Sequence, residues 1–203
     1  MSTPSAQKLS PRRLQMVQVD VFTDRVLTGN SLAVFLDGRG LSTDEMQALA
    51  REMNLSETTF ILPADSAKQD PAAEPAVHRP ALHNEDRGIR VRIFTVQEEL
   101  PFAGHPTLGT AFVLRNQSVA STPPDEIRLH LNVGTVPVRF SQPPSQPLFG
   151  EMTQQNPVFG AIHDAAAVAR LTGLTAADFD DSAPIQTVST GVPFTIAPLP
   201  PSR

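Results

Sequence analysis

The sequence contains no cysteine, no tryptophan and no tyrosine. The absence of cysteine excludes disulfide bonds, thiolate metal ligands and cysteine catalysis. Phenylalanine alone supplies the large aromatic side chains, which disfavours the stacking platforms of proteins that bind single-stranded nucleic acid. No run approaches the about 20 apolar residues that cross a bilayer, and the N-terminus lacks the hydrophobic core of a signal peptide.

The charge of the chain is mildly acidic, because 16 Lys and Arg residues stand against 21 Asp and Glu residues. Clusters of Lys and Arg are missing, which argues against nucleic acid or an anionic membrane as the main partner. With 203 residues, 40% of them hydrophobic, the chain is long enough for one large domain or two small ones. We therefore expect a cytoplasmic enzyme or binding protein.

Residues 98–114, EELPFAGHPTLGTAFVL, predict a buried helix that starts at Gly104, His105 and Pro106. Proline is tolerated in the first turn of a helix but not in its interior. Apolar, small or hydroxylated residues follow up to Arg115, which is typical of a helix buried on every side. Because the first N–H groups of a helix lack partners within it, we expect this helix start to bind a carboxylate or another anion.

The residues before this helix predict alternating strands and helices. Ser42 and Glu45 form the pattern of a capping box, which marks the start of a helix. The turn residues 28–30 lie between two strand patterns and predict a hairpin. The expected elements are strands at residues 14–22, 31–36, 58–62 and 89–94 and a helix from residue 42 to 54.

The second half of the chain begins the same order of elements again. Strand patterns at residues 129–140 and 184–199 flank an amphipathic helix at 164–174, and no second glycine-opened helix follows before Arg203. The alternative is that the likeness of the two halves is accidental. The domain organisation that we expect is a mobile tail at 1–12, a first lobe at 13–128 with a long loop at 63–88, and an incomplete second lobe at 129–203.

Three stretches in order along the chain, spread over residues 19–30, 54–60 and 99–109, resemble the PhzF family of phenazine biosynthesis proteins. The stretches read VDVFT with a following GN, NLSETTF, and ELPFAGHPTLG. The resemblance places the chain in the diaminopimelate epimerase-like superfamily. It implies an α+β fold of two similar lobes, each a mostly antiparallel sheet curled around one central helix, with the second lobe incomplete here.

The resemblance also implies an activity and a site. The activity is that of an isomerase or epimerase that moves a proton between carbons of a small carboxylate metabolite without a cofactor or metal. Glu57 is then the acid/base catalyst, and Gly104 and His105 line the substrate site, which Asn30 and Ser56 border. Members of the family are often dimers, so the resemblance also implies a possible homodimer.

Proton transfer to and from carbon requires a carboxyl group that acts as base and then as acid. We expect the apolar neighbours Leu55, Phe60 and Ile61 to raise the pKa of Glu57 toward neutrality. Preorganised N–H donors at Gly104 and His105 would stabilise the negative charge that develops in the substrate. In some superfamily relatives two cysteines share the proton transfer. This chain has no cysteine and cannot use that mechanism.

Other interpretations of these residues stay open. A Glu between a helix and a strand is most often a solvated boundary residue, and a His at a helix start often bonds a neighbouring loop. Glu98 and Glu99 are expected to be exposed, and His78 and His83 have no third ligand for a metal. The alternative function is a truncated, inactive relative that acts as a binding or interaction module, with exposed strand edges and apolar surface in its second lobe.

Overall fold

The structure is a computed structural model, and it describes residues 12–62, 88–118 and 122–201. Almost all of the predicted tail and long loop therefore lies outside the described residues. In the described part of the chain, no helix is long and apolar enough to cross a membrane.

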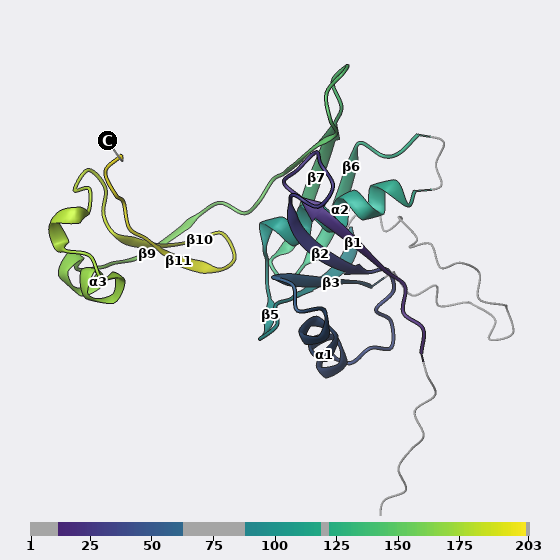
Figure 1. Cartoon of the computed structure of the whole chain (residues 1–203), viewed down its shortest axis with the longest axis horizontal. Helices are drawn as coiled ribbons and strands as arrows, with labels where there is room; N and C mark the ends of the chain where they lie inside the picture. The colour runs from purple at the N-terminus through teal and green to yellow at the C-terminus, as the bar shows by residue number, and fades with distance from the viewer. Residues whose placement is uncertain (1–11, 63–87, 119–121, 202–203) are drawn as a thin grey trace, which may run out of the picture.

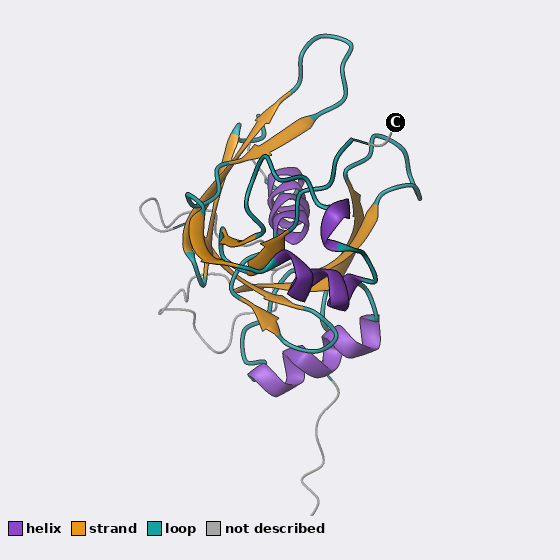
Figure 2. Ribbon diagram, turned by 90° about the vertical axis from the view of Figure 1, so that its left-hand side faces the viewer, coloured by secondary structure: helices purple, strands orange, loops and turns teal. Residues whose placement is uncertain are grey.

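A large curled sheet forms the main body of the molecule (Figures 1 and 2). Its strands are β1 (Met16–Val21), β2 (Asn30–Phe35), β3 (Glu57–Leu62), β4 (Ile89–Phe94), β5 (Glu99–Leu100), β6 (Glu126–Leu131), β7 (Gly134–Ser141) and β8 (Phe149–Met152). The strand order is β1-β2-β3-β4-β6-β7-β8, and β5 pairs with β4. Only β2 with β3 and β4 with β6 run parallel, so the sheet is mostly antiparallel, as predicted.

Helix α2 (Gly104–Asn116) lies inside the curl of this sheet, where Figure 2 shows strands around it. It contacts β1, β2 and β3 on one side and β6, β7 and β8 on the other. Gly109 permits the close approach of β2, because a Cβ there would lie 2.6 Å from a methyl group of Leu32. The predicted central helix is confirmed, except that Phe112 is 38% exposed and so the helix is not buried on every side.

The opposite face of the sheet is covered by α1 (Thr43–Met53). Ser42 caps this helix and forms the predicted capping box with Glu45. Met46 and Ala50 of α1 pack on three phenylalanines of the sheet, and two of these rings stack at 4.8 Å between centroids. These three rings are Phe35, Phe60 and Phe94. The predicted hairpin is also confirmed, since β1 and β2 pair antiparallel.

A second, smaller unit follows an extended segment and lies beside the main body in Figure 1. It contains β9 (Val158–Ile162), α3 (Ala165–Thr172), the short 3-10 helix η1 (Ala176–Asp178), β10 (Gln186–Ser189) and β11 (Pro193–Ile196). The strand order is β11-β10-β9, so β9 and β11 are edges.

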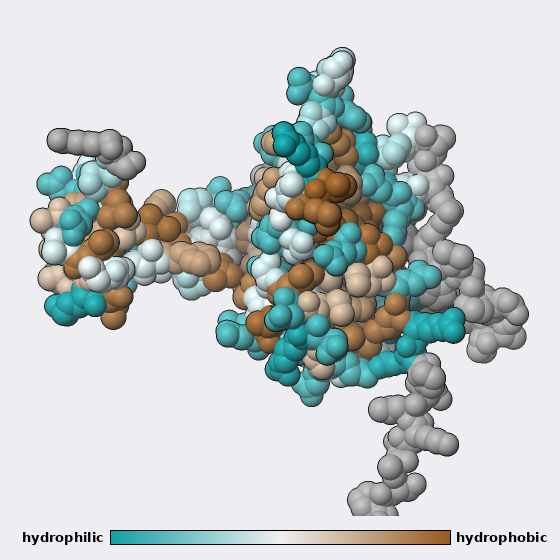
Figure 3. Space-filling view, in the orientation of Figure 1, coloured by the Kyte–Doolittle hydropathy of each residue, from teal (hydrophilic) through white to brown (hydrophobic). Residues whose placement is uncertain are grey.

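One face of this small sheet exposes large apolar side chains. Phe194 pairs with Val188 of β10, and Val188 pairs with Phe159 of β9, so the three side chains share a face. Phe159 is 66% exposed and Phe194 63% exposed, and apolar residues reach the surface of this unit in Figure 3. The apolar surface and strand edges anticipated for the second lobe are therefore present.

The predicted division between residues 128 and 129 falls inside β6. Strand β6 pairs in parallel with β4 and carries β7 and β8 with it, so residues 126–152 extend the first sheet. The alternation of residues within β6 and β7 indicates that they are strands, but it does not say with which strand they pair. The sequence pattern therefore did not reveal that they belong to the first sheet. We place the division between the two units after Met152.

Candidate active site

Glu57 and His105 meet at one edge of the large sheet. Glu57 is the first residue of β3, and His105 lies in the first turn of α2, packed inside the curl. His105 Nδ1 lies 2.8 Å from Glu57 Oε2, and the two side chains are only 8% and 18% exposed. The structure thus pairs a carboxyl group with an imidazole at the start of the central helix.

Asn30 lies beside this pair because β2 and β3 are parallel, and parallel strands begin at the same edge of a sheet. The backbone carbonyl of Asn30 lies 2.9 Å from His105 Nε2. The side-chain carbonyl of Asn30 accepts a hydrogen bond of 3.2 Å from the Ser56 hydroxyl. A continuous chain of hydrogen bonds therefore joins the two strand starts to the helix.

The geometry assigns the protons of His105. A carbonyl oxygen only accepts, so Nε2 carries a hydrogen that it donates to Asn30. The contact between Nδ1 and Glu57 Oε2 requires one further hydrogen, which belongs either to the imidazole or to the carboxyl group. The hydrogen bond with His105 lowers the pKa of Glu57, which favours the carboxylate form of this side chain.

The expectation of a raised pKa for Glu57 is wrong. The hydrogen bond from His105 lowers the pKa of the carboxyl group from its usual value of 4.5, and it outweighs the opposite effect of burial. Phe60 and Ile61 are fully buried in the two cores of the protein. Sequence proximity suggested an apolar pocket around Glu57, but the contact that dominates comes from a residue far along the chain.

The start of α2 carries no side-chain cap and no acidic residue in its first turn. Its first helical hydrogen bond runs from the N–H of Thr107 to the carbonyl of Ala103 at 3.3 Å. The N–H groups of Gly104 and His105 precede that bond and point out of the helix start. Together with the helix dipole they suit an anion, and the binding of one here stays a prediction.

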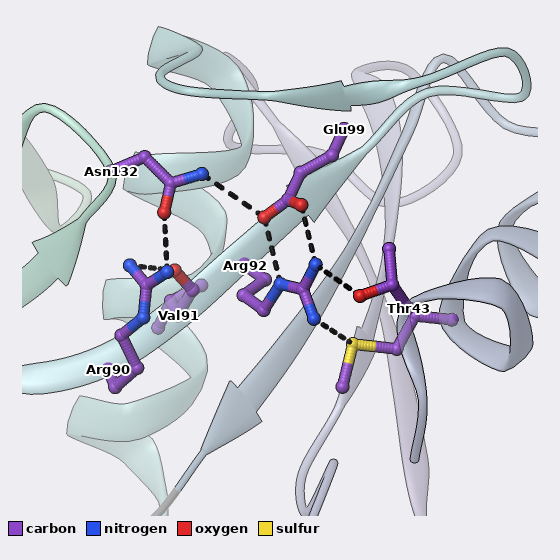
Figure 4. A network of polar contacts seen from close by, with 7 residues as sticks. Thr43, Arg90, Val91, Arg92, Glu99 and Asn132 are labelled. Carbon is purple, nitrogen blue, oxygen red and sulfur yellow. Dashed lines mark hydrogen bonds and ion pairs between the residues drawn. The ribbon is translucent and has the colours of Figure 1, made fainter.

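An ion-pair network supports the chain that leads into this helix (Figure 4). Glu99 accepts two hydrogen bonds from Arg92, at 2.8 and 2.5 Å, and a third from Asn132 at 3.1 Å. Arg92 also donates to the Thr43 hydroxyl of α1, and its hydrogen bonds to Glu99 are the main reason why the pKa of Glu99 is lowered. Glu98 is exposed as expected, but Glu99 is half-buried, so that expectation was wrong for Glu99.

Asn30, Ser56, Glu57, Gly104 and His105 are therefore neighbours in space, while their roles stay predictions. Sequence reasoning missed Phe22, whose ring centroid lies 6.1 Å from that of His105. Within the described residues, no group of three His, Asp or Glu side chains is placed to hold a metal. His78 and His83 lie outside those residues.

Comparisons with known proteins point to one family. Its sequence model, described as phenazine biosynthesis-like protein (PhzC-PhzF), matches residues 19–203. The trans-2,3-dihydro-3-hydroxyanthranilate isomerase of Pseudomonas aeruginosa is 37% identical over 163 residues, which are 80% of this chain and 50% of that enzyme. The chain spans about half the length of the curated relatives it matches.

Solved structures agree on the fold. A predicted epimerase from Pseudomonas aeruginosa superposes with a TM-score of 0.71 at 38% identity, over 93% of this chain and 60% of that one. A hydroxyproline epimerase from Agrobacterium vitis, only 9% identical, has a TM-score of 0.50 over 83% of this chain and 48% of its own. The second likeness concerns the fold alone, and it supports the α+β, diaminopimelate epimerase-like architecture.

Proposed function

Because the chain belongs to the phenazine biosynthesis-like family, we propose that it is an isomerase that moves a proton between two carbons of a small carboxylate metabolite. Glu57 is the acid/base group, and no cofactor takes part. The observation that carries the proposal is the Glu57–His105 pair, 2.8 Å apart at the uncapped start of the central helix. A relative at 37% identity is named an isomerase, which supports the reaction class.

The proton balance closes within the substrate. Oε2 of Glu57 faces His105, so Oε1 accepts the proton from a substrate C–H bond. The electron pair of that bond moves into the adjacent unsaturated or carboxyl system. The carboxyl group of Glu57 then returns the proton to a different carbon, which completes an isomerisation without oxidation or reduction.

The substrate's negative charge is held at the helix start. The N–H groups of Gly104 and His105 and the positive end of the helix dipole attract its carboxylate. The His105 ring, 2.8 Å from Glu57 Oε2, holds that carboxyl group beside the same helix start. Asn30 and Ser56 hold this imidazole in place, through the carbonyl at 2.9 Å and the hydroxyl bonded to the Asn30 side chain at 3.2 Å.

Deuterium uptake at carbon tests the proposal. The chain is incubated in D2O with a panel of small unsaturated and amino carboxylic acids, beside Glu57→Gln. Glu52→Gln is the matched control, since Glu52 is an exposed glutamate of α1. We expect uptake by the native chain and the control and its loss in Glu57→Gln. Equal uptake by all three proteins would refute the role of Glu57.

A second candidate is ligand binding without turnover. It is favoured by the exposed apolar face of the small sheet. This form would bind carboxylates at Gly104 and His105 in a saturable way and show no uptake with any acid. The same exposed face suits a homodimer, which we propose as the assembly of this chain.

A further inference from the structure

Phe22 combines two unusual properties beside the proposed site. Its side chain is 71% exposed, which is high for the largest apolar residue type in this chain. Its backbone has φ 63°, the left-handed region that a bulky residue without special support avoids. Backbone strain of this kind persists where surrounding contacts fix it, and it gathers at functional sites.

The turn that follows Phe22 fixes this conformation. Asp20 accepts hydrogen bonds from the N–H of Leu27 at 2.8 Å and from the Ser31 hydroxyl at 2.7 Å. The hydroxyls of Thr23 and Thr28 meet at 2.5 Å across the turn. These bonds tie the turn to both strands of the hairpin, so the orientation of Phe22 is determined by its support and not by burial.

Gly29 closes the turn behind Phe22. A Cβ at this position would lie 2.4 Å from the carbonyl oxygen of Val21 and 2.6 Å from a methyl group of Thr23. Only glycine allows the two ends of the turn to approach in this way. The turn therefore depends on Gly29 and on the partly buried carboxylate of Asp20, and together they keep the Phe22 ring exposed to solvent.

The ring of Phe22 lies near His105 and also lines an apolar cavity. Its centroid is 6.1 Å from the His105 ring, with the planes tilted by 40°. Phe22 also lines a cavity of about 280 Å³ with Leu108 and Phe112 of α2 and Phe149 of β8. A ligand whose carboxylate occupies the start of α2 would thus meet Phe22 with its carbon skeleton.

We propose that Phe22 is a specificity-determining residue that contacts the substrate and favours carboxylates with an apolar body over those that offer a carboxylate alone. This proposal rests on the proposed function, because it uses the same helix start as the anion site. The exposed face of the ring contacts the ligand. Because the turn already fixes Phe22, little conformational freedom of this residue is lost on binding. An aromatic ligand gains further from an offset or edge-to-face contact.

Acetate and benzoate are the probes, because they share a carboxylate and differ by the ring. Their dissociation constants are measured from the amide signals of Gly104 and His105 in NMR titrations of the 15N-labelled chain. We expect benzoate to bind about tenfold more tightly than acetate, the size of one aromatic contact. Phe22→Asn, which suits a left-handed backbone, should lose most of this preference and change acetate binding by less than about twofold.

Two further variants make the test specific. Phe22→Leu keeps an apolar side chain and should retain part of the preference. Leu171→Ala removes an apolar side chain of high exposure, 87%, from α3 of the smaller unit and should alter neither constant. Dispersed amide spectra establish that each variant is folded.

The proposal is overturned if Phe22→Asn keeps the full preference for benzoate, if Leu171→Ala loses it equally, or if neither ligand shifts the amide signals of Gly104 and His105. Its failure is distinguishable from that of the proposed function. Uptake of deuterium that depends on Glu57, with an unchanged preference in Phe22→Asn, removes the specificity role alone. A preference that depends on Phe22, with no uptake for any acid, removes the proton transfer alone.

Discussion

Replacing His105 by Gln separates the two hydrogen bonds of its imidazole. The glutamine amide takes the place of Nε2 and keeps the donor to the Asn30 carbonyl, while the partner of Glu57 is removed. The largest cause of the lowered pKa of Glu57 disappears, and burial, which raises the pKa, is then opposed only by the weaker effect of the hydrogen bond with Ser56. We expect the pKa of Glu57 to rise in His105→Gln, as followed by the 13C shift of its carboxyl carbon.

The cost in stability follows from the same contact. A hydrogen bond to a charged group contributes about 1.5–3 kcal/mol, and we expect the lower half of that range, because Glu57 is still 18% exposed to water. Urea unfolding followed by circular dichroism measures it, since the chain has no tryptophan or tyrosine for fluorescence. His163→Gln is the matched control, because the His163 side chain lies far from Glu57 in the chain and bonds the Thr187 hydroxyl, at 2.7 Å.

The pH dependence gives the sign of the effect. The folded-state pKa of Glu57 is lowered below 4.5, so its ionised form stabilises the fold above that pH. This contribution is lost as the pH falls through the folded-state pKa. The difference in unfolding free energy between the native chain and His105→Gln should therefore be constant above about pH 5 and shrink in more acidic solution. A difference that grows with acidity would refute the pairing.

Three other changes have expected outcomes. Gly29→Ala should lower the free energy of unfolding by about 1–3 kcal/mol in urea titrations, because its Cβ would lie 2.4 Å from the Val21 carbonyl oxygen; an unchanged midpoint would contradict the tight turn. Phe22→Asn should raise the free energy of unfolding, measured by thermal denaturation, by about 0.5–1 kcal/mol, because Asn tolerates φ 63° better than Phe. A lower free energy of unfolding would argue against backbone strain at this position. Phe194→Ser should weaken self-association in sedimentation experiments, and an unchanged mass would place the dimer contact elsewhere.

Local patterns were enough to predict most elements of the large sheet. The capping box at Ser42 and the proline in the first turn of α2 are signals carried by a few adjacent residues, and both helices start where these signals stand. The alternation of apolar and polar residues found β1, which turns one face toward the core, whereas residues 32–35 of β2 are buried on both faces. Strand β9 lacks that signal, since all five of its residues are exposed, and it was not predicted.

Features that depend on distant residues were harder to predict. The parallel pairing of β4 with β6 joins residues 89–90 to 129–130, and no local pattern specifies this choice. The lowered pKa of Glu57 comes from His105, whose position depends on how α2 packs within the sheet. Phe22 lies in the VDVFT stretch that carries the family resemblance, but none of its sequence neighbours predicts that its backbone adopts the left-handed conformation.

The measurement that tests the central claim most directly is the initial rate of deuterium uptake at carbon in Glu57→Gln, relative to Glu52→Gln. General acid/base catalysis contributes about 10²–10⁴-fold to a rate, so we expect a loss of at least about 100-fold in Glu57→Gln and none in Glu52→Gln. Both variants should be folded by circular dichroism. Uptake in Glu57→Gln within about twofold of the control would contradict the assignment of Glu57 as the proton carrier.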